Sequence, residues 1–178
     1  MKRLTAFLLV CLTAIGCLTG CGSSDKVNSS DEQAFLEKFL QATYDEPDGY
    51  IFYTSTVPEG GIEIAKAAGE WDKMVDEYSG HHFSRSTGSK HDPDSVRKVA
   101  DLSDEEISYA ETYFAEEYGQ KVKVNSGSVY CSTVEIFYDD KDPNKLYGYM
   151  IVLDLDGEGL KICPYDPAYL KREYGDQE

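Results

Sequence analysis

The spacing of the apolar residues changes near Gly119, and this change constrains the fold more than any other sequence feature. Before Gly119, apolar residues recur three and four positions apart, which is typical of amphipathic helices. From Lys121 onward they alternate with polar residues, which is typical of strands. The strands are predicted as a meander over residues 121–125, 129–138, 146–155 and 160–163. The sequence therefore predicts an α+β fold with two to three helices packed on one face of a curled antiparallel sheet.

Two of the predicted helices begin with a capping box. In this motif a serine hydroxyl accepts a hydrogen bond from a first-turn N–H, and an acidic or amide side chain three residues later accepts one from the serine N–H. The pairs are Ser30 with Gln33 and Ser103 with Glu106. A third apolar stripe predicts a helix with Trp71 in the core. The helices are predicted over residues 30–44, 64–80 and 103–119.

Three segments between these helices carry other signals. Residues 50–56 are aromatic and β-branched, and they are predicted as a strand. Residues 58–61, with proline and two glycines, are expected to break the chain. Residues 79–93 are rich in serine, glycine and histidine and are predicted as a loop. Ser126 and Gly127 are expected to form a turn between strands.

The N-terminus has the layout of a secretory leader. Lys2 and Arg3 precede an apolar run over residues 6–15, which is too short to span a hydrocarbon core of ~30 Å. We therefore interpret residues 1–20 as a signal peptide. Residues 21–30 are small and polar and predict a flexible tether, and residues 31–178 are expected to form a single domain.

The end of this leader, Leu18-Thr19-Gly20-Cys21, resembles the lipobox of bacterial lipoproteins. The resemblance implies cleavage before Cys21 and a diacylglycerol on its sulfur, which would hold the protein on the extracytoplasmic face of the cell membrane. Cys17 follows a rival motif, but alanine stands there where leucine is preferred. Cys21 is therefore the expected lipidation site.

The chain is strongly acidic, with 17 basic and 33 acidic residues and a formal net charge of −16. Without Lys2 and Arg3 of the leader, the charge is about −18. Such a domain repels nucleic-acid phosphates and anionic lipid headgroups. No nucleic-acid partner is therefore expected, and attachment to a membrane is expected through the lipid on Cys21.

Two cysteines, Cys131 and Cys163, remain in the predicted domain. The alternation of their strands suggests that both lie on the more polar face of the sheet, where they could be neighbours. A disulfide would close a loop of about 30 residues and contribute roughly 3–4 kcal/mol. The alternative is two unpaired, buried thiols.

Candidate metal and catalytic residues gather in the polar loop, where His81, His82 and His91 lie near Asp92 and Asp94. These side chains could hold zinc, but no His-Glu-x-x-His motif or paired cysteine motif accompanies them, and a solvated loop is the preferred interpretation.

No serine of that loop sits in a nucleophile elbow. The spacing of Asp140, Asp142 and Asn144 is that of a calcium loop, but Lys145 and Ile151 replace the required glycine and glutamate. The sequence thus predicts no cofactor, no metal site and no catalytic residue.

Fourteen tyrosines are present. Tyr147 and Tyr149 share a face of their predicted strand with the apolar residues Ile151, Leu153 and Leu155, so they are predicted to pack in the core. Tyr130 and Tyr138 share a face with Val134 and Ile136 and are predicted to do the same. The alternative is that exposed aromatic rings bind glycans or peptides at an envelope surface.

The order of elements, with an N-terminal helix, further helices and then antiparallel strands, resembles the cystatin-like and NTF2-like folds of small bacterial lipoproteins. The resemblance implies a pocket between helix and sheet. The expected function is that of a small binding or interaction module, not an enzyme, on the extracytoplasmic face of a membrane. The alternative is an envelope-located hydrolase that uses histidine and carboxylate side chains.

Overall fold

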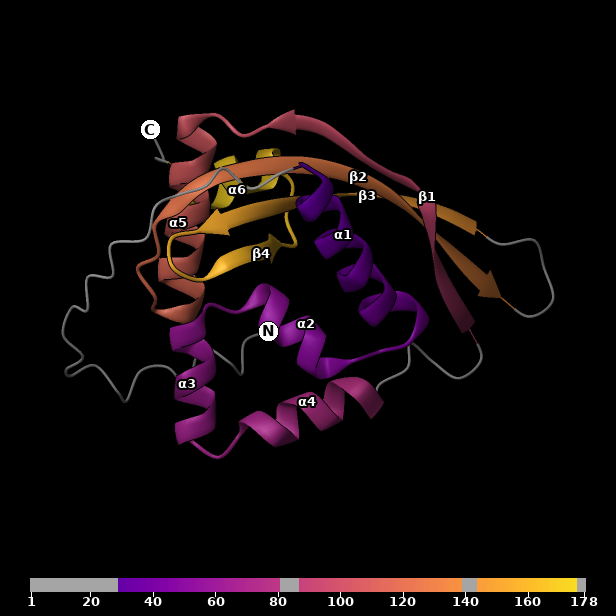
Figure 1. Ribbon diagram of the computed structural model, residues 1–178, viewed down its shortest axis with the longest axis horizontal. Helices are drawn as coiled ribbons and strands as arrows, with labels where there is room; N and C mark the ends of the chain where they lie inside the picture. Colours follow the sequence, from indigo (N-terminus) through magenta and orange to yellow (C-terminus); the bar gives the residue numbers. More distant parts are fainter. Residues whose placement is uncertain (1–28, 81–86, 139–143, 176–178) are drawn as a thin grey trace.

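The computed structural model describes residues 29–80, 87–138 and 144–175, and these residues have the expected α+β architecture (Figure 1). A single sheet has the strand order β1-β2-β3-β4, with each strand antiparallel to the next. The strands are β1 (Thr87–Asp101), β2 (Val124–Tyr138), β3 (Asn144–Leu155) and β4 (Gly159–Cys163). The helices are α1 (Ser29–Leu40), the π-helix η2 (Gln41–Asp45), α2 (Gly49–Thr56), α3 (Glu59–Ala67), α4 (Trp71–Gly80), α5 (Asp104–Tyr118) and α6 (Pro167–Tyr174).

Helices cover both faces of the sheet, whereas the sequence predicted only one covered face. Val152 of β3 and Ile162 of β4 pack against Leu36 and Leu40 of α1. Their strand neighbours point to the opposite face and pack with α5 and α6, because successive strand residues alternate. This second cluster contains Ala110, Phe114, Val129, Ile151, Leu153, Cys163 and Leu170. We call the two sides the α1 face and the α5 face.

The predicted helix behind Ser103 is confirmed in detail. The Ser103 hydroxyl accepts from the Glu106 N–H, and the Glu106 carboxylate accepts from the Ser103 N–H. Gly119 ends the helix with φ +66°, a left-handed conformation that glycine adopts without strain. The capping box predicted for α1 is not formed as expected, because the Gln33 side chain donates to Glu37 Oε1 instead.

Residues 50–56 form the helix α2, and the prediction of a strand was wrong. The Asp48 side chain caps the helix by accepting from the Ile51 N–H at 3.0 Å. The Gly49 N–H donates to Ser79 Oγ of α4 at 2.8 Å, so the two helices touch at the glycine. The Phe52 ring stacks on Tyr78 of α4 with 4.1 Å between ring centroids. Packing against α4 therefore overrides the strand preference of the aromatic residues.

The helix predicted around Trp71 is two helices, α3 and α4, separated at Gly69, which has φ +71°. Pro58 directly precedes α3 and its carbonyl accepts from the Ile62 N–H, so the expected break at residues 58–61 is in fact the start of a helix. Trp71 is half-buried and meets Tyr50 and Tyr53 of α2 edge to face.

The strand β1 occupies part of the segment predicted as a loop. This strand lies at the edge of the sheet, and its register with β2 shifts between Asp92 and Arg97 and again between Lys98 and Ala100. Ser126 and Gly127 do not form a turn but lie inside β2. A Cβ atom on Gly127 would come within 2.6 Å of the Leu102 side chain, so a larger residue there would displace that side chain.

The β3–β4 hairpin fastens α2 and α3 to the sheet. Lys161 of β4 is 6% exposed, and its Nζ donates to the Thr54 carbonyl near the end of α2 at 2.8 Å. Glu158 Oε2 accepts from the Glu59 N–H at the start of α3 at 2.7 Å. A cation thus meets a helix C-terminus and an anion meets a helix N-terminus, as the helix dipoles favour. Burial lowers the pKa of Lys161.

Candidate functional site: the open end of the sheet

One end of the sheet extends beyond the helices that cover the rest of it (Figure 1). Residues 144–149 of β3 are exposed, whereas Ile151, Val152 and Leu153, further along the same strand, are buried. Tyr147 is 77% exposed and Tyr149 is 54% exposed. The prediction that these two tyrosines pack in the core was therefore wrong, because the helices that bury the α5 face contact only the other end of the strands.

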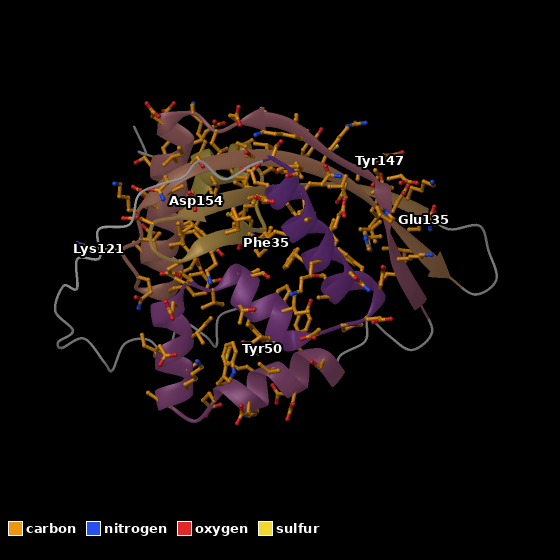
Figure 2. All side chains as sticks on the ribbon, viewed as in Figure 1. Phe35, Tyr50, Lys121, Glu135, Tyr147 and Asp154 are labelled. Carbon is orange, nitrogen blue, oxygen red and sulfur yellow. The ribbon has the colours of Figure 1, made fainter. Side chains whose placement is uncertain are left out.

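The strand register arranges the side chains of this end in three cross-strand rows. Residues directly opposite each other in antiparallel strands share a face. Tyr149 is two residues from Ile151 and therefore lies on the same face, the α5 face, and so do all three rows. We call this surface the open face. Its rows are Lys90–Glu135–Lys145, Asp92–Thr133–Tyr147 and Arg97–Cys131–Tyr149, each running from β1 through β2 to β3. Figure 2 shows Tyr147 and Glu135 at the end of the sheet away from α5.

The charges of the open face are only partly paired. Lys145 Nζ lies 3.0 Å from Glu135 Oε1, and this contact raises the pKa of Lys145, with a further contribution from Asp92. Lys90 and Arg97 are exposed and form no ion pair with any residue that the structure describes. The open face thus carries three cations and two carboxylates in a chain with a net charge of −16.

The predicted disulfide between Cys131 and Cys163 is not formed, and both cysteines are free. Cys163 lies opposite Ile151 of β3, which in turn lies opposite Val129 of β2. The two cysteines share the α5 face as predicted, but β3 runs between their strands. Two strand spacings are about 10 Å, which exceeds the Cα separation that a disulfide spans.

The two thiols have different surroundings. Cys131 is partly exposed on the open face, whereas Cys163 is buried against α5 and α6. Burial raises the pKa of Cys163 to about 12.

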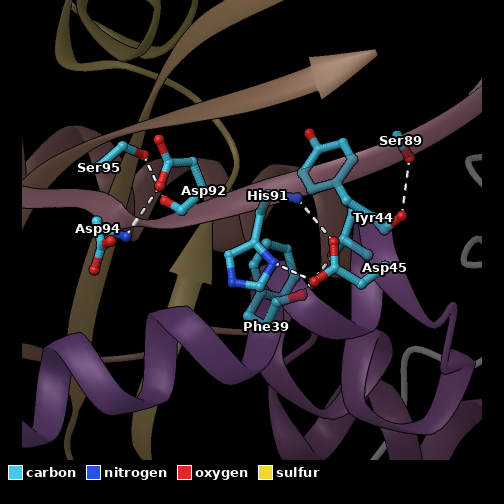
Figure 3. Close-up of polar contacts among 9 residues, drawn as sticks. Phe39, Tyr44, Asp45, Ser89, His91, Asp92, Asp94 and Ser95 are labelled. Atoms are coloured by element: carbon cyan, nitrogen blue, oxygen red, sulfur yellow. Dashed lines mark hydrogen bonds and ion pairs between the residues drawn. The ribbon is translucent and has the colours of Figure 1, made fainter. Parts of the chain in front are cut away.

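His91 is the one histidine of the predicted cluster that falls within the described residues; His81 and His82 lie outside them. It lies on β1 and is buried, so the solvated-loop interpretation is wrong for this side chain. Asp45, the last residue of η2, contacts it twice (Figure 3). Asp45 Oδ1 accepts from the His91 backbone N–H at 2.8 Å, and Asp45 Oδ2 lies 2.6 Å from His91 Nδ1.

These contacts give the His91–Asp45 pair a structural role at the edge of the sheet. The His91 N–H donates to Asp45, so it points away from β2, at the edge where a further strand would pair. The Ser89 hydroxyl donates to the Tyr44 carbonyl at 2.9 Å and thereby fastens the same edge to η2. Asp45 and Tyr44 therefore cover an edge that would otherwise be open to strand addition.

The other candidate residues do not join His91. Asp92 accepts from the Asp94 N–H through Oδ1 and from the Ser95 hydroxyl through its carbonyl, which stabilises the bulge of β1 (Figure 3). No group of three or more histidine, cysteine, aspartate or glutamate side chains within the described ranges could hold a metal ion. Asp140 and Asp142 lie outside those ranges, and Asn144 begins β3.

A buried carboxylate at the start of α1 was not predicted. Glu32 is 5% exposed and accepts from the Tyr130 hydroxyl at 2.9 Å and from the Ser128 hydroxyl at 3.1 Å. Lys98 Nζ lies 3.6 Å from it. Burial and the contact with Glu32 raise the pKa of Tyr130, whose predicted place in the core is confirmed. The network attaches the first turn of α1 to β2.

Comparisons with known proteins found no match for this chain. No family model, no curated protein and no solved structure matches the chain. Among the described residues, no helix is both long and apolar enough to cross a membrane. The predicted signal peptide, Cys21 and most of the tether lie outside the described residues, as does the side chain of Tyr138.

Proposed function

We propose that this chain is a lipid-anchored, extracytoplasmic binding protein that presents the open face to its ligand. The observation that carries the proposal is the exposure of Tyr147 and Tyr149 on a strand whose other half is buried in the core. Large exposed aromatic side chains on a firmly held surface are typical of binding sites, because the rings gain contact area with little loss of conformational freedom.

The proposed lipid anchor rests on the sequence Leu18-Thr19-Gly20-Cys21. The two acyl chains expected on Cys21 suffice for stable membrane attachment, whereas the acidity of the chain opposes electrostatic attachment to anionic lipid. The domain begins with α1 at Ser29, so a short polar segment separates it from the lipid.

A hydrolase remains the alternative. Its support is the acidity of the chain and the histidine–aspartate cluster, of which His91 is the histidine within the described residues. The imidazole and the backbone N–H of His91 both contact Asp45, and the Ser89 hydroxyl donates to the Tyr44 carbonyl. No hydrogen bond within the described residues joins Ser89 to His91, as a Ser–His relay requires. The contacts of this group therefore favour its role at the sheet edge.

Acylation of Cys21 is the test of the anchor. The full chain and its Cys21→Ala and Cys17→Ala variants are produced in a bacterium that is fed an alkyne-labelled fatty acid. We expect label on the parent and on Cys17→Ala, and none on Cys21→Ala. Intact mass should show a mature chain that begins with acylated Cys21. Label that persists on Cys21→Ala would place the anchor on another residue. Label that is lost from Cys17→Ala alone would place it on Cys17.

A further inference from the structure

We propose that the open face binds an acidic polysaccharide, with sugar rings stacked on Tyr147 and Tyr149 and anionic groups paired with Arg97 and Lys90. The inference rests on the proposed binding role of the open face and adds the class of ligand. It does not depend on the lipid anchor.

The positions of the two tyrosines suit a linear chain of rings. They are two residues apart on β3, a central strand, so their Cα atoms lie about 7 Å apart and both side chains stand on the same face. Their rings therefore form a row along the strand. The C–H faces of sugar rings stack on such aromatic rings, and neighbouring units of one chain can occupy neighbouring rings.

The surroundings of the tyrosines favour a sugar over a protein surface. The core of a protein–protein interface is apolar and depleted in charge. Each row of the open face instead contains charged residues: Lys90, Glu135 and Lys145 in one, Asp92 in the next and Arg97 in the third. These charged side chains supply donors and acceptors for hydroxyl groups close to both rings.

The charge of the open face selects an anionic ligand. Lys145 is neutralised by Glu135 at 3.0 Å, but Lys90 and Arg97 have no ion pair within the described part of the chain. Both lie on β1, two strands from β3. Arg97 is in the row of Tyr149, at a distance of about 10 Å, and Lys90 is one row beyond Tyr147. A substituent that projects sideways from a stacked sugar ring can reach them. The rest of the chain is strongly acidic and repels the same ligand, which directs it to this face.

Affinity electrophoresis of the full chain in mild detergent tests the proposal. Two acidic polysaccharides, carboxymethylcellulose and polygalacturonate, are compared with hydroxyethylcellulose, which has the carboxymethylcellulose backbone without the charge. Polyglutamate supplies the charge without sugar rings. We expect retardation by at least one acidic polysaccharide, weaker at high salt, and none by hydroxyethylcellulose or polyglutamate.

Variants locate the site. Tyr147→Ala and Tyr149→Ala should each weaken binding roughly tenfold, as expected for loss of one stacked ring. Arg97→Gln should lower the affinity and should also reduce the dependence of the affinity on salt concentration. Tyr50→Ala is the matched control, because Tyr50 is 58% exposed but lies on α2, away from the open face. The affinity of this variant for the polysaccharide should stay at the parent level. Circular dichroism verifies that each variant is folded.

Four outcomes would overturn the proposal. Equal retardation by polyglutamate would reduce the interaction to charge, and equal retardation by hydroxyethylcellulose would remove the anionic requirement. Parent affinity in both tyrosine variants would move the site elsewhere. No retardation by either acidic polymer would exclude the ligand class. Because the purified chain is used, these results are independent of the Cys21 acylation test, and either can fail alone.

Discussion

The Asp45 carboxylate binds His91 at two points, with Oδ1 on the backbone N–H at 2.8 Å and Oδ2 at 2.6 Å from Nδ1. One side chain at the end of η2 thus takes the place that a neighbouring strand would have beside β1. The pair is nearly enclosed, with side-chain exposures of 8% for His91 and 21% for Asp45. Loss of either partner leaves buried polar atoms of the other without a partner.

Replacement of Asp45 should therefore destabilise the fold. We expect Asp45→Ala to lower the free energy of unfolding by about 2 kcal/mol or more, because it leaves the His91 backbone N–H unsatisfied and removes the carboxylate beside His91 Nδ1. Urea unfolding at neutral pH measures the effect. Asp94→Ala is the control, since Asp94 is exposed and its one hydrogen bond within the described residues is made by its backbone N–H. A loss for Asp45→Ala no larger than that of the control would contradict the proposed role at the strand edge.

The contact between α2 and α4 gives a second prediction. A Cβ atom on Gly49 would lie 2.2 Å from the Val75 carbonyl oxygen, a backbone atom that cannot move without shifting α4. Gly49→Ala should therefore cost roughly 1–3 kcal/mol of stability. Gly80→Ala, at the end of α4, meets nothing within 4 Å and should leave the unfolding midpoint nearly unchanged. Similar midpoints for both variants would show that α2 and α4 are not in this close contact.

Lys161 supports a prediction about the hairpin that fastens the helices. Lys161→Ala removes the donor to the Thr54 carbonyl and the cation near Glu158, and we expect a loss of about 2 kcal/mol. Lys171→Ala on the exposed side of α6 is the matched control, with an expected change within about 0.5 kcal/mol. Urea unfolding followed by circular dichroism compares the two. Equal stability of both variants would mean that Lys161 does not hold α2 to the sheet.

The two thiols should differ in reactivity. In the native chain at pH 8, a thiol reagent should modify Cys131 and leave Cys163 protected until the chain unfolds, because Cys163 is fully buried. Chains with Cys131→Ser or Cys163→Ser identify which thiol reacts. Absence of both thiols in the denatured, unreduced protein would instead demonstrate the disulfide that the strand order opposes.

Burial of the Cys163 thiol also predicts a dependence of stability on pH. Its pKa in the folded chain, about 12, is raised above the value near 9 of an exposed thiol. The resulting stabilisation is complete below about pH 9 and is lost as the pH rises toward about 12.

The stability difference between the parent and Cys163→Ala measures this effect. Between pH 8 and pH 10 this difference should shrink by about 1 kcal/mol. A constant difference would mean that the thiol is solvated.

The features that could be predicted from sequence depend on local signals. The period of apolar residues and the Ser103–Glu106 capping box determine α5, and strict alternation determines most of β2, β3 and β4. The strand β1 escaped prediction because an edge strand needs few apolar residues, and α2 because its aromatic residues favour a strand until α4 packs on them.

The site could be predicted less well, because it depends on relations between distant segments. Alternation placed Tyr147 and Tyr149 on the face of Ile151, which is correct. The alternation of residues along β3 does not determine how far α5 and α6 cover that face. Strand order likewise decides that Cys131 and Cys163 are separated by β3, and Asp45 has no neighbour in sequence that indicates His91 as its partner.

The network around Glu32 has a mechanical consequence. The Tyr130 hydroxyl binds the Glu32 carboxylate and also lies 3.4 Å from the Ser29 carbonyl, the first residue of α1. A pull on the chain that precedes Ser29 is therefore transmitted to β2, an inner strand held on both sides by backbone hydrogen bonds. The load then acts across several strands at once, and α1 is protected from being peeled off the sheet one turn at a time.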